Sequence, residues 1–140
     1  MIGGQSSRFG SPKWKVTMNG ITILDRLWEA CNRFETRIVI GKEQPRELGK
    51  QFLKDELEGQ APIIGLYTLL KNSTHDWNLL LSCDLPMMTA GLLEKIWENR
   101  DSEKDIIAPE SDAHLQVTCA FYHRRLADTV EAFISNGQLS

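Results

Sequence analysis

Two kinds of apolar segment alternate along this chain. Apolar residues recur at helical spacing in four segments, at residues 21–34, 62–70, 92–97 and 126–134. Short apolar runs typical of buried strands lie at residues 36–41, 77–84, 105–109 and 115–122. Chains that alternate helices with buried strands usually pack the helices on both faces of a parallel sheet. We therefore expect an α/β protein with three layers, α/β/α, and a mostly parallel sheet.

Several residues predict where these helices begin and end. Pro62 suits the first turn of a helix, and Thr89 can cap the helix that carries Leu92 and Ile96. Asn136-Gly137 is typical of a left-handed stop after the last helix. The charged segment 41–59 is expected to be a solvated loop and helix.

Composition limits the possible functions. With 140 residues, 41% of them hydrophobic, the chain can bury one core, so we expect a single domain over residues 1–140. Its 16 basic and 19 acidic residues are mixed along the sequence, which argues against a nucleic-acid partner. No apolar run approaches the roughly 20 residues that a membrane-spanning helix needs, and no signal peptide is recognisable. We expect a cytoplasmic protein without a membrane partner.

The cysteines indicate neither a disulfide framework nor a zinc site. Cys31, Cys83 and Cys119 are odd in number, far apart, and form no C-x-x-C pair. We expect reduced thiols.

The glycine-rich segment "GGQSSRFG" at residues 3–10 predicts a phosphate-binding loop. It follows Met1 and Ile2, and its glycines would allow backbone N–H groups to approach a ligand closely. Arg8 and Lys13 add a forked and a compact cation, which suit phosphate oxygens in different geometries. A plain glycine-rich turn would explain the glycines but not the two cations.

Asp84 emerges directly from the apolar run "LLLSCD". Ligands of parallel α/β sheets bind beyond the carboxyl ends of the strands, where this carboxylate is expected. Mg²⁺ commonly takes only one or two protein carboxylates and completes its shell with phosphates and water. Asp84 is therefore a candidate magnesium ligand, although a helix cap or turn residue would also fit.

Three segments together resemble a known family. "GGQSSRFGSPK", "DELEGQAPIIGL" and "LLLSCDLPM", in this order and spacing, are similar to the molybdenum cofactor guanylyltransferase (MobA) family of the nucleotidyltransferase superfamily. The resemblance covers nearly the whole chain and implies a Rossmann-like fold. It implies roles in GTP binding for a set of residues: Gly3, Gly4, Ser6, Lys13, Asp55 and Asp84. It also implies that Asp84 binds Mg²⁺ and that Arg8, Lys13 and Asp84 act in catalysis.

The activity implied by the resemblance is transfer of GMP from GTP to the phosphate of metal-loaded molybdopterin, with release of pyrophosphate. The acceptor oxygen is already an anion, so no Ser, Cys or His nucleophile is required, and the protein supplies alignment and charge stabilisation. The implied cofactor is Mg²⁺, and the implied partners are GTP, molybdopterin and other proteins of molybdenum-cofactor synthesis and use.

Some features depart from the family pattern. Ala61 stands where members usually have Gly, and Gln116-Val117-Thr118 replaces a His-Pro-Leu-like segment. Members have a full apolar strand before the Gly-Gly pair and a C-terminal region beyond Gly137. We therefore expect a chain truncated at both ends, with low or absent activity of its own. Two alternatives stay open: another nucleotidyltransferase, using CTP with molybdopterin or a sugar-phosphate or phospholactate substrate, and a non-catalytic nucleotide-binding remnant.

Overall fold

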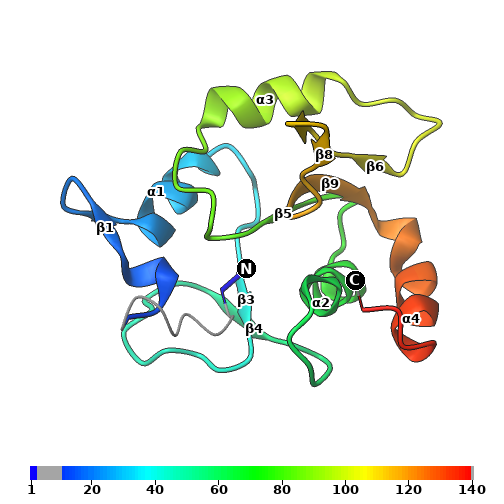
Figure 1. Cartoon of the computed structure of the whole chain (residues 1–140), viewed down its shortest axis with the longest axis horizontal. Helices are drawn as coiled ribbons and strands as arrows, with labels where there is room; N and C mark the ends of the chain where they lie inside the picture. The colour runs from blue at the N-terminus through cyan, green and yellow to red at the C-terminus, as the bar shows by residue number, and fades with distance from the viewer. Residues whose placement is uncertain (3–10, 140) are drawn as a thin grey trace.

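The computed structural model describes residues 1–2 and 11–139 (Figure 1). Its helices are η1 (Lys13–Lys15), α1 (Ile23–Ala30), α2 (Pro62–Asn72), α3 (Ala90–Glu98), η2 (Arg124–Leu126) and α4 (Ala127–Ser135), where η marks a 3₁₀ helix. Its strands are β1 (Thr17–Met18), β2 (Ile21–Thr22), β3 (Val39–Gly41), β4 (Phe52–Lys54), β5 (Trp77–Leu81), β6 (Ile106–Ile107), β7 (Glu110–Ser111), β8 (His114–Leu115) and β9 (Cys119–His123). None of the described helices is long and apolar enough to cross a membrane.

The described strands pair in both directions. β9 lies between β5 and β6 and is antiparallel to both, whereas β3 and β4 form a parallel pair. Two short antiparallel hairpins, β1–β2 and β7–β8, complete the pairings. The mixed α/β class is as predicted; the predicted parallel pairing is found at β3–β4, whereas β9 runs antiparallel to both of its neighbours. Antiparallel pairing needs no helical crossover, so the order of helices and strands in the sequence does not determine the direction of β9.

The central sheet is covered on both faces. Ala120 and Tyr122 of β9 pack into a cluster with α2 and α4. The alternate residues Cys119 and Phe121 pack into a second cluster with α3. Because side chains alternate across a strand, β9 carries two apolar faces, and each receives helices. This part of the fold has the three layers expected from the sequence.

The predicted helix ends are found at α2, α3 and α4. Pro62 opens α2, the Thr89 hydroxyl accepts a hydrogen bond from the Leu92 amide at 3.3 Å, and Gly137 has a φ of +73° after α4. α1 is shorter than its apolar spacing predicts. Ile21 lies in β2 because Asn19-Gly20, both with positive φ, turn the chain into a hairpin, and Thr22 then caps α1.

The charged segment after β3 contains a strand rather than the expected helix. Phe52–Lys54 forms β4 and pairs with β3, from Val39 opposite Phe52 to Gly41 opposite Lys54. Three residues among charged neighbours are too few to show a period in the sequence, so this strand depends on its long-range partner. All three cysteines are free, as predicted.

Candidate active site at the carboxyl ends of the strands

Met1 and Ile2 lie between β3 and β5 and run parallel to both. The Met1 nitrogen donates a hydrogen bond to the Leu81 carbonyl at 2.7 Å, and the Met1 carbonyl accepts one from the Cys83 thiol, so the segment advances in the direction of β5. The Ile2 amide donates to the Ile40 carbonyl at 2.8 Å. The carboxyl ends of β3, β5 and the Met1–Ile2 segment therefore meet at one edge.

Asp84 lies at this edge, in a turn that follows β5, and its side chain is exposed. It does not cap α3, because Thr89 holds that position. Among the described residues, the hydrogen bonds and ion pairs include none to the Asp84 carboxylate. Its carboxylate oxygens therefore face solvent at the strand end, as a magnesium ligand requires.

Asp55 follows β4 at the same edge, and one of its oxygens is buried. The Asp55 amide donates to the Gly41 carbonyl at 2.8 Å, which fixes the residue beside the end of β3. Oδ1 is buried and has no hydrogen-bond partner within the described part of the chain. Burial raises the pKa of the Asp55 carboxyl, while the positive charges of Lys42 and the Met1 amine oppose that rise. A buried carboxylate oxygen without a partner is costly unless a ligand satisfies it.

Electrostatic effects connect the predicted site residues. Burial lowers the pKa of the Met1 amine, and Asp55 and Asp84 are both among the negative groups that oppose this lowering. Burial also raises the pKa of the Cys83 thiol. The negative charge of Asp84 adds to this rise, and the positive charge of Lys13 opposes it. Lys13, in η1, is exposed. The structure thus gathers Lys13, Asp55 and Asp84 around the Met1–Ile2 segment.

The other predicted residues of the phosphate-binding loop are Gly3, Gly4, Ser6 and Arg8. They lie outside the described residues. Ala61, which departs from the family pattern, has a φ of −92°. An alanine adopts this conformation without strain, so the backbone before α2 does not require glycine here.

Sequence reasoning missed two residues that bear on the site. Lys42 follows β3, and its positive charge acts on the Asp55 carboxyl. The sequence signal that could have identified Lys42 is a cation placed directly after a buried strand. Thr68 of α2 is fully buried, and its hydroxyl accepts a hydrogen bond from the Glu56 amide at 3.0 Å. This bond anchors the chain next to Asp55. No sequence signal marks Thr68, because Glu56 is twelve residues away.

The carboxylates at this edge suit a magnesium ion. Asp84 offers exposed oxygens, and Asp55 has an oxygen that lacks a partner. The described residues contain no cluster of three or more His, Cys, Asp or Glu side chains that could hold a metal alone. Mg²⁺ needs no such cluster, because substrate phosphates and water fill most of its shell.

Comparisons with known proteins show which family the chain resembles. A family model described as a MobA-like NTP transferase domain matches residues 1–140. A molybdenum cofactor guanylyltransferase of Campylobacter jejuni is 28% identical over 99% of this chain and 74% of its own length. A probable molybdenum cofactor guanylyltransferase of a Nostoc species is 31% identical, over 98% of this chain and 70% of its own length.

Solved structures share the fold. Molybdopterin-guanine dinucleotide biosynthesis protein A of Archaeoglobus fulgidus superimposes with a TM-score of 0.81 at 21% identity, over 99% of this chain and 73% of that protein. A putative protein of Aquifex aeolicus gives a TM-score of 0.77 at 26% identity, over 84% of this chain. This chain spans 64% of that Aquifex protein.

Proposed function

Because this chain belongs to the family of MobA-like NTP transferase domains, a nucleotidyltransferase family, we propose that it transfers GMP from GTP to the phosphate of molybdenum-loaded molybdopterin. The products are the molybdopterin guanine dinucleotide cofactor and pyrophosphate. We further propose that residues 1–140 act as one nucleotidyltransferase-like domain. The observation that carries the proposal is the convergence of Asp55 and Asp84 on the Met1–Ile2 segment, which the predicted phosphate loop follows in the sequence.

The chemistry requires a binding surface more than a reactive side chain. An oxygen of the acceptor phosphate forms a bond to the α-phosphorus of GTP, and the bond from that phosphorus to the bridging oxygen of the pyrophosphate breaks. Asp84 and Asp55 would hold Mg²⁺, which when bound neutralises negative charge on phosphate oxygens. Lys13, with the loop amides and Arg8 implied by the sequence, would offset the charge on the departing pyrophosphate.

The binding experiment is a calorimetric titration of the chain with GTP and with CTP, each with and without Mg²⁺. We expect magnesium-dependent binding of GTP that exceeds the binding of CTP. Tighter binding of CTP would assign the chain to the cytidylyl-transferring alternative. No magnesium-dependent binding of either nucleotide would reject the proposed site.

The catalytic experiment measures pyrophosphate release with molybdenum-loaded molybdopterin as acceptor. Binding of GTP without pyrophosphate release would indicate a nucleotide-binding remnant. Release that depends on a sugar phosphate or phospholactate instead would identify a different acceptor.

Asp84→Asn provides the residue-level test. The substitution keeps the shape of the side chain and removes its charge, so turnover is expected to fall by about a hundredfold or more. Because Asp84 is exposed and its carboxylate makes no hydrogen bond or ion pair with the described residues, the melting temperature should stay nearly unchanged. Asp101→Asn is the matched control, since Asp101 is an exposed aspartate beyond the other end of α3. Equal losses of turnover and of thermal stability in Asp84→Asn would contradict the assigned role.

A further inference from the structure

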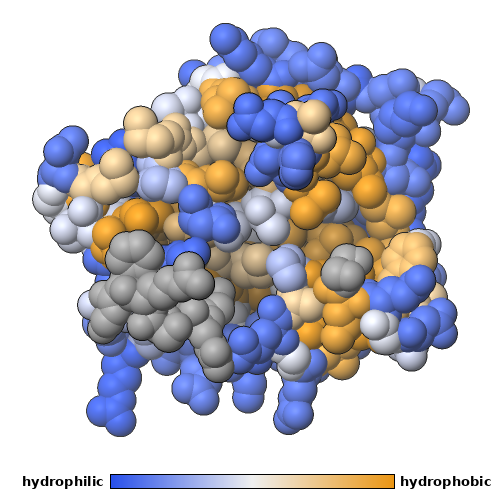
Figure 2. All heavy atoms as spheres, viewed as in Figure 1, coloured by the Kyte–Doolittle hydropathy of each residue, from blue (hydrophilic) through white to orange (hydrophobic). Residues whose placement is uncertain are grey.

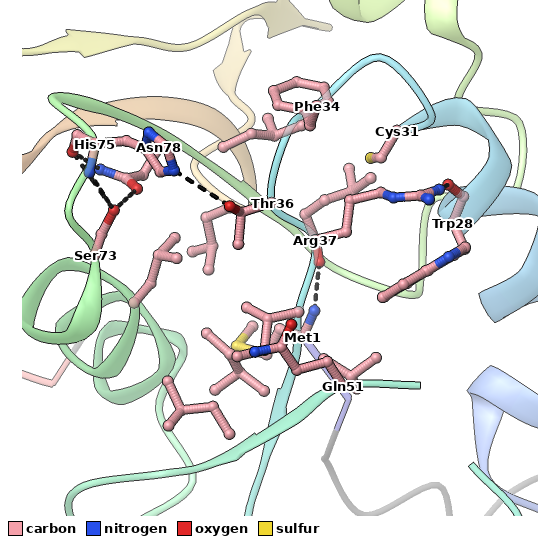
Figure 3. A pocket seen from close by; sticks show the side chains of 18 of the residues that line it. Met1, Trp28, Cys31, Phe34, Thr36, Arg37, Gln51, Ser73, His75 and Asn78 are labelled. Carbon is pink, nitrogen blue, oxygen red and sulfur yellow. Dashed lines mark hydrogen bonds between the residues drawn. The ribbon is translucent and has the colours of Figure 1, made fainter. Parts of the chain in front are cut away.

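Two neighbouring cavities share Phe34, Glu35 and Trp77 as lining residues. The first, of about 540 Å³, extends from Met1 along β3 and β5 (Figure 3). Figure 2 shows hydrophobic residues around a recess in the middle of the molecule, within a mainly hydrophilic outer edge. The second cavity, of about 470 Å³, lies between the end of α1 and α3 and has the size of a small-molecule site.

We call the second cavity the α1–α3 groove. Its lining combines aromatic rings with carboxylates: Phe34, Trp77, Trp97, Phe121, Glu35 and Glu94. Trp77 is the first residue of β5, whereas Asp84 follows the end of that strand. Neither Asp55 nor Asp84 lines the groove. The groove is therefore separate from the candidate active site and lies toward the opposite ends of the strands.

Aromatic rings form the floor and one wall of the groove. Trp77 meets Trp97 edge-on with ring centroids 5.9 Å apart, and it meets His123 edge-on at 5.2 Å. Trp97 lies 5.1 Å from Phe121, which also stacks with Phe34 at 6.1 Å. Trp77, Trp97 and Phe34 are only half-buried, so a ligand can reach them. Aromatic faces are negative and attract cations, and tryptophan does so most strongly.

Most tryptophans of this chain already have a cation over the ring. Trp14, Trp28 and Trp97 each have a lysine or arginine, at 5.1, 4.8 and 4.9 Å from the ring centroid. Figure 3 shows one of these cations, Arg37, extending toward Trp28. Within residues 1–2 and 11–139, Trp77 is the one tryptophan without such a partner. The groove thus offers a tryptophan that the chain itself leaves without a cation.

The rim of the groove is negative. Glu35 and Glu94 contribute two carboxylates and Arg33 one guanidinium, which leaves a net charge of −1. Arg33 pairs with Glu94, but their side chains are 75% and 45% exposed, so this ion pair is weak and Arg33 can turn into solvent. Glu35 is exposed and belongs to none of the ion pairs between described residues.

We propose that the α1–α3 groove binds a small organic cation, a quaternary or alkylated ammonium attached to an apolar body. The apolar body would lie against the buried side chains of Leu93 and Phe121. The ammonium would face the Trp77 ring and the Glu35 carboxylate. A quaternary ammonium has no N–H donor that needs a partner, so aromatic faces and nearby carboxylates are sufficient to recognise it.

The test titrates the isotope-labelled full chain with phenethyltrimethylammonium and with its neutral isostere, in which carbon replaces the nitrogen. The indole N–H resonances of the four tryptophans report where each probe binds. We expect Trp77 and Trp97 to shift, while Trp14 and Trp28, which lie outside the groove, do not. The cation should bind about fivefold or more tightly than the isostere.

Three variants test the charges at the rim. Glu35→Gln should weaken binding of the cation by about threefold, because it removes a carboxylate without changing the shape of the side chain. Arg33→Gln should strengthen binding by about twofold or more, because it frees the Glu94 carboxylate. Glu98→Gln is the matched control, since Glu98 is exposed in α3 but does not line the groove. It should leave the affinity unchanged.

Equal affinities for the cation and its isostere would overturn the proposal, as would tighter binding of the anion 3-phenylpropionate. Unshifted Trp77 and Trp97 resonances, or an equal effect of Glu35→Gln and Glu98→Gln, would also overturn it. The titration uses no nucleotide, magnesium or molybdopterin, so its outcome is independent of the proposed function.

Discussion

At the scale of single residues, the surroundings of two aspartates shift their carboxyl pKa values in opposite directions. Burial dominates at Asp55 and raises the pKa of its carboxyl, whereas a hydrogen bond from Lys50 dominates at Asp25 and lowers the pKa of that carboxyl. Asp55 is thus a residue whose ionised form the fold itself disfavours. Carboxyl groups whose pKa is shifted by burial and by specific charged neighbours are common at functional sites.

The pH dependence of Asp55→Asn follows from the sign of its pKa shift. A raised folded pKa means that the folded state holds the proton longer, so Asp55 reduces stability as the pH rises from its ordinary pKa through the folded pKa. Asp55→Asn should therefore be more stable than the starting chain near neutral pH, and this gain should vanish in acid. Urea unfolding between about pH 3 and pH 8, which extends below the ordinary pKa of an aspartate, measures it.

Asp25→Asn is the control, because its effect on the free energy of unfolding is expected to have the opposite sign. The lowered folded pKa of Asp25 contributes stability above its ordinary pKa, and this contribution is lost as the pH falls through the folded pKa. The variant should be the less stable one at neutral pH and should match the starting chain in strong acid. A gain at neutral pH in both variants would refute the burial effect assigned to Asp55.

At the scale of elements, α2 positions the chain that carries Asp55. The buried Thr68 hydroxyl donates to the Ile64 carbonyl at 2.9 Å and accepts from the Glu56 amide at 3.0 Å. One side chain of α2 thereby fixes the residue after Asp55. The stability of this connection depends on a hydroxyl, not on apolar packing alone.

Thr68→Val should lower the free energy of unfolding by about 1–3 kcal/mol, because the side chain keeps its shape and leaves the Glu56 amide without its partner. Hydrogen exchange at the Glu56 amide should be faster in this variant. Thr68→Ser retains the hydroxyl and should preserve the slow exchange, despite the loss of a methyl group. Unchanged exchange in Thr68→Val would mean that the bond does not hold this loop.

At the scale of the whole molecule, close backbone approach between distant segments joins the two sheets. A Cβ atom on Gly41 would lie 2.6 Å from the Ile2 carbonyl oxygen. Gly41 therefore permits the Met1–Ile2 segment to reach β3, and this contact brings the end of that segment to the edge that carries Asp55 and Asp84.

Gly41→Ala should destabilise the protein by about 1–3 kcal/mol, because the added methyl group displaces backbone. Gly91→Ala is the matched control: Gly91 lies in α3 with open space around it, and alanine there should stabilise the helix by up to about 1 kcal/mol. Thermal unfolding of both variants tests the pair. Equal effects of the two substitutions would contradict the close approach at Gly41.

Some helices and strands could be predicted from the sequence and others could not. The apolar run of β5 and the Thr89 cap of α3 are local signals, and both predictions are confirmed. The β1–β2 hairpin also had a local signal, Asn19-Gly20, which the helical spacing of the neighbouring apolar residues obscured. β4 had none, because only its pairing with β3 distinguishes it from a charged loop.

For the candidate site, neighbouring sequence was enough to select Lys13, which follows the glycine-rich segment, and Asp84, which ends an apolar run, whereas Asp55 was selected only from the family resemblance. These properties belong to neighbours in sequence, so the chain alone determined its α/β class, its helix caps and its site candidates. The direction of β9, the insertion of Met1–Ile2 between β3 and β5, and the burial of Asp55 Oδ1 depend on contacts between distant segments. Only tertiary structure decided them, because backbone pairing and desolvation act between residues that the sequence keeps apart.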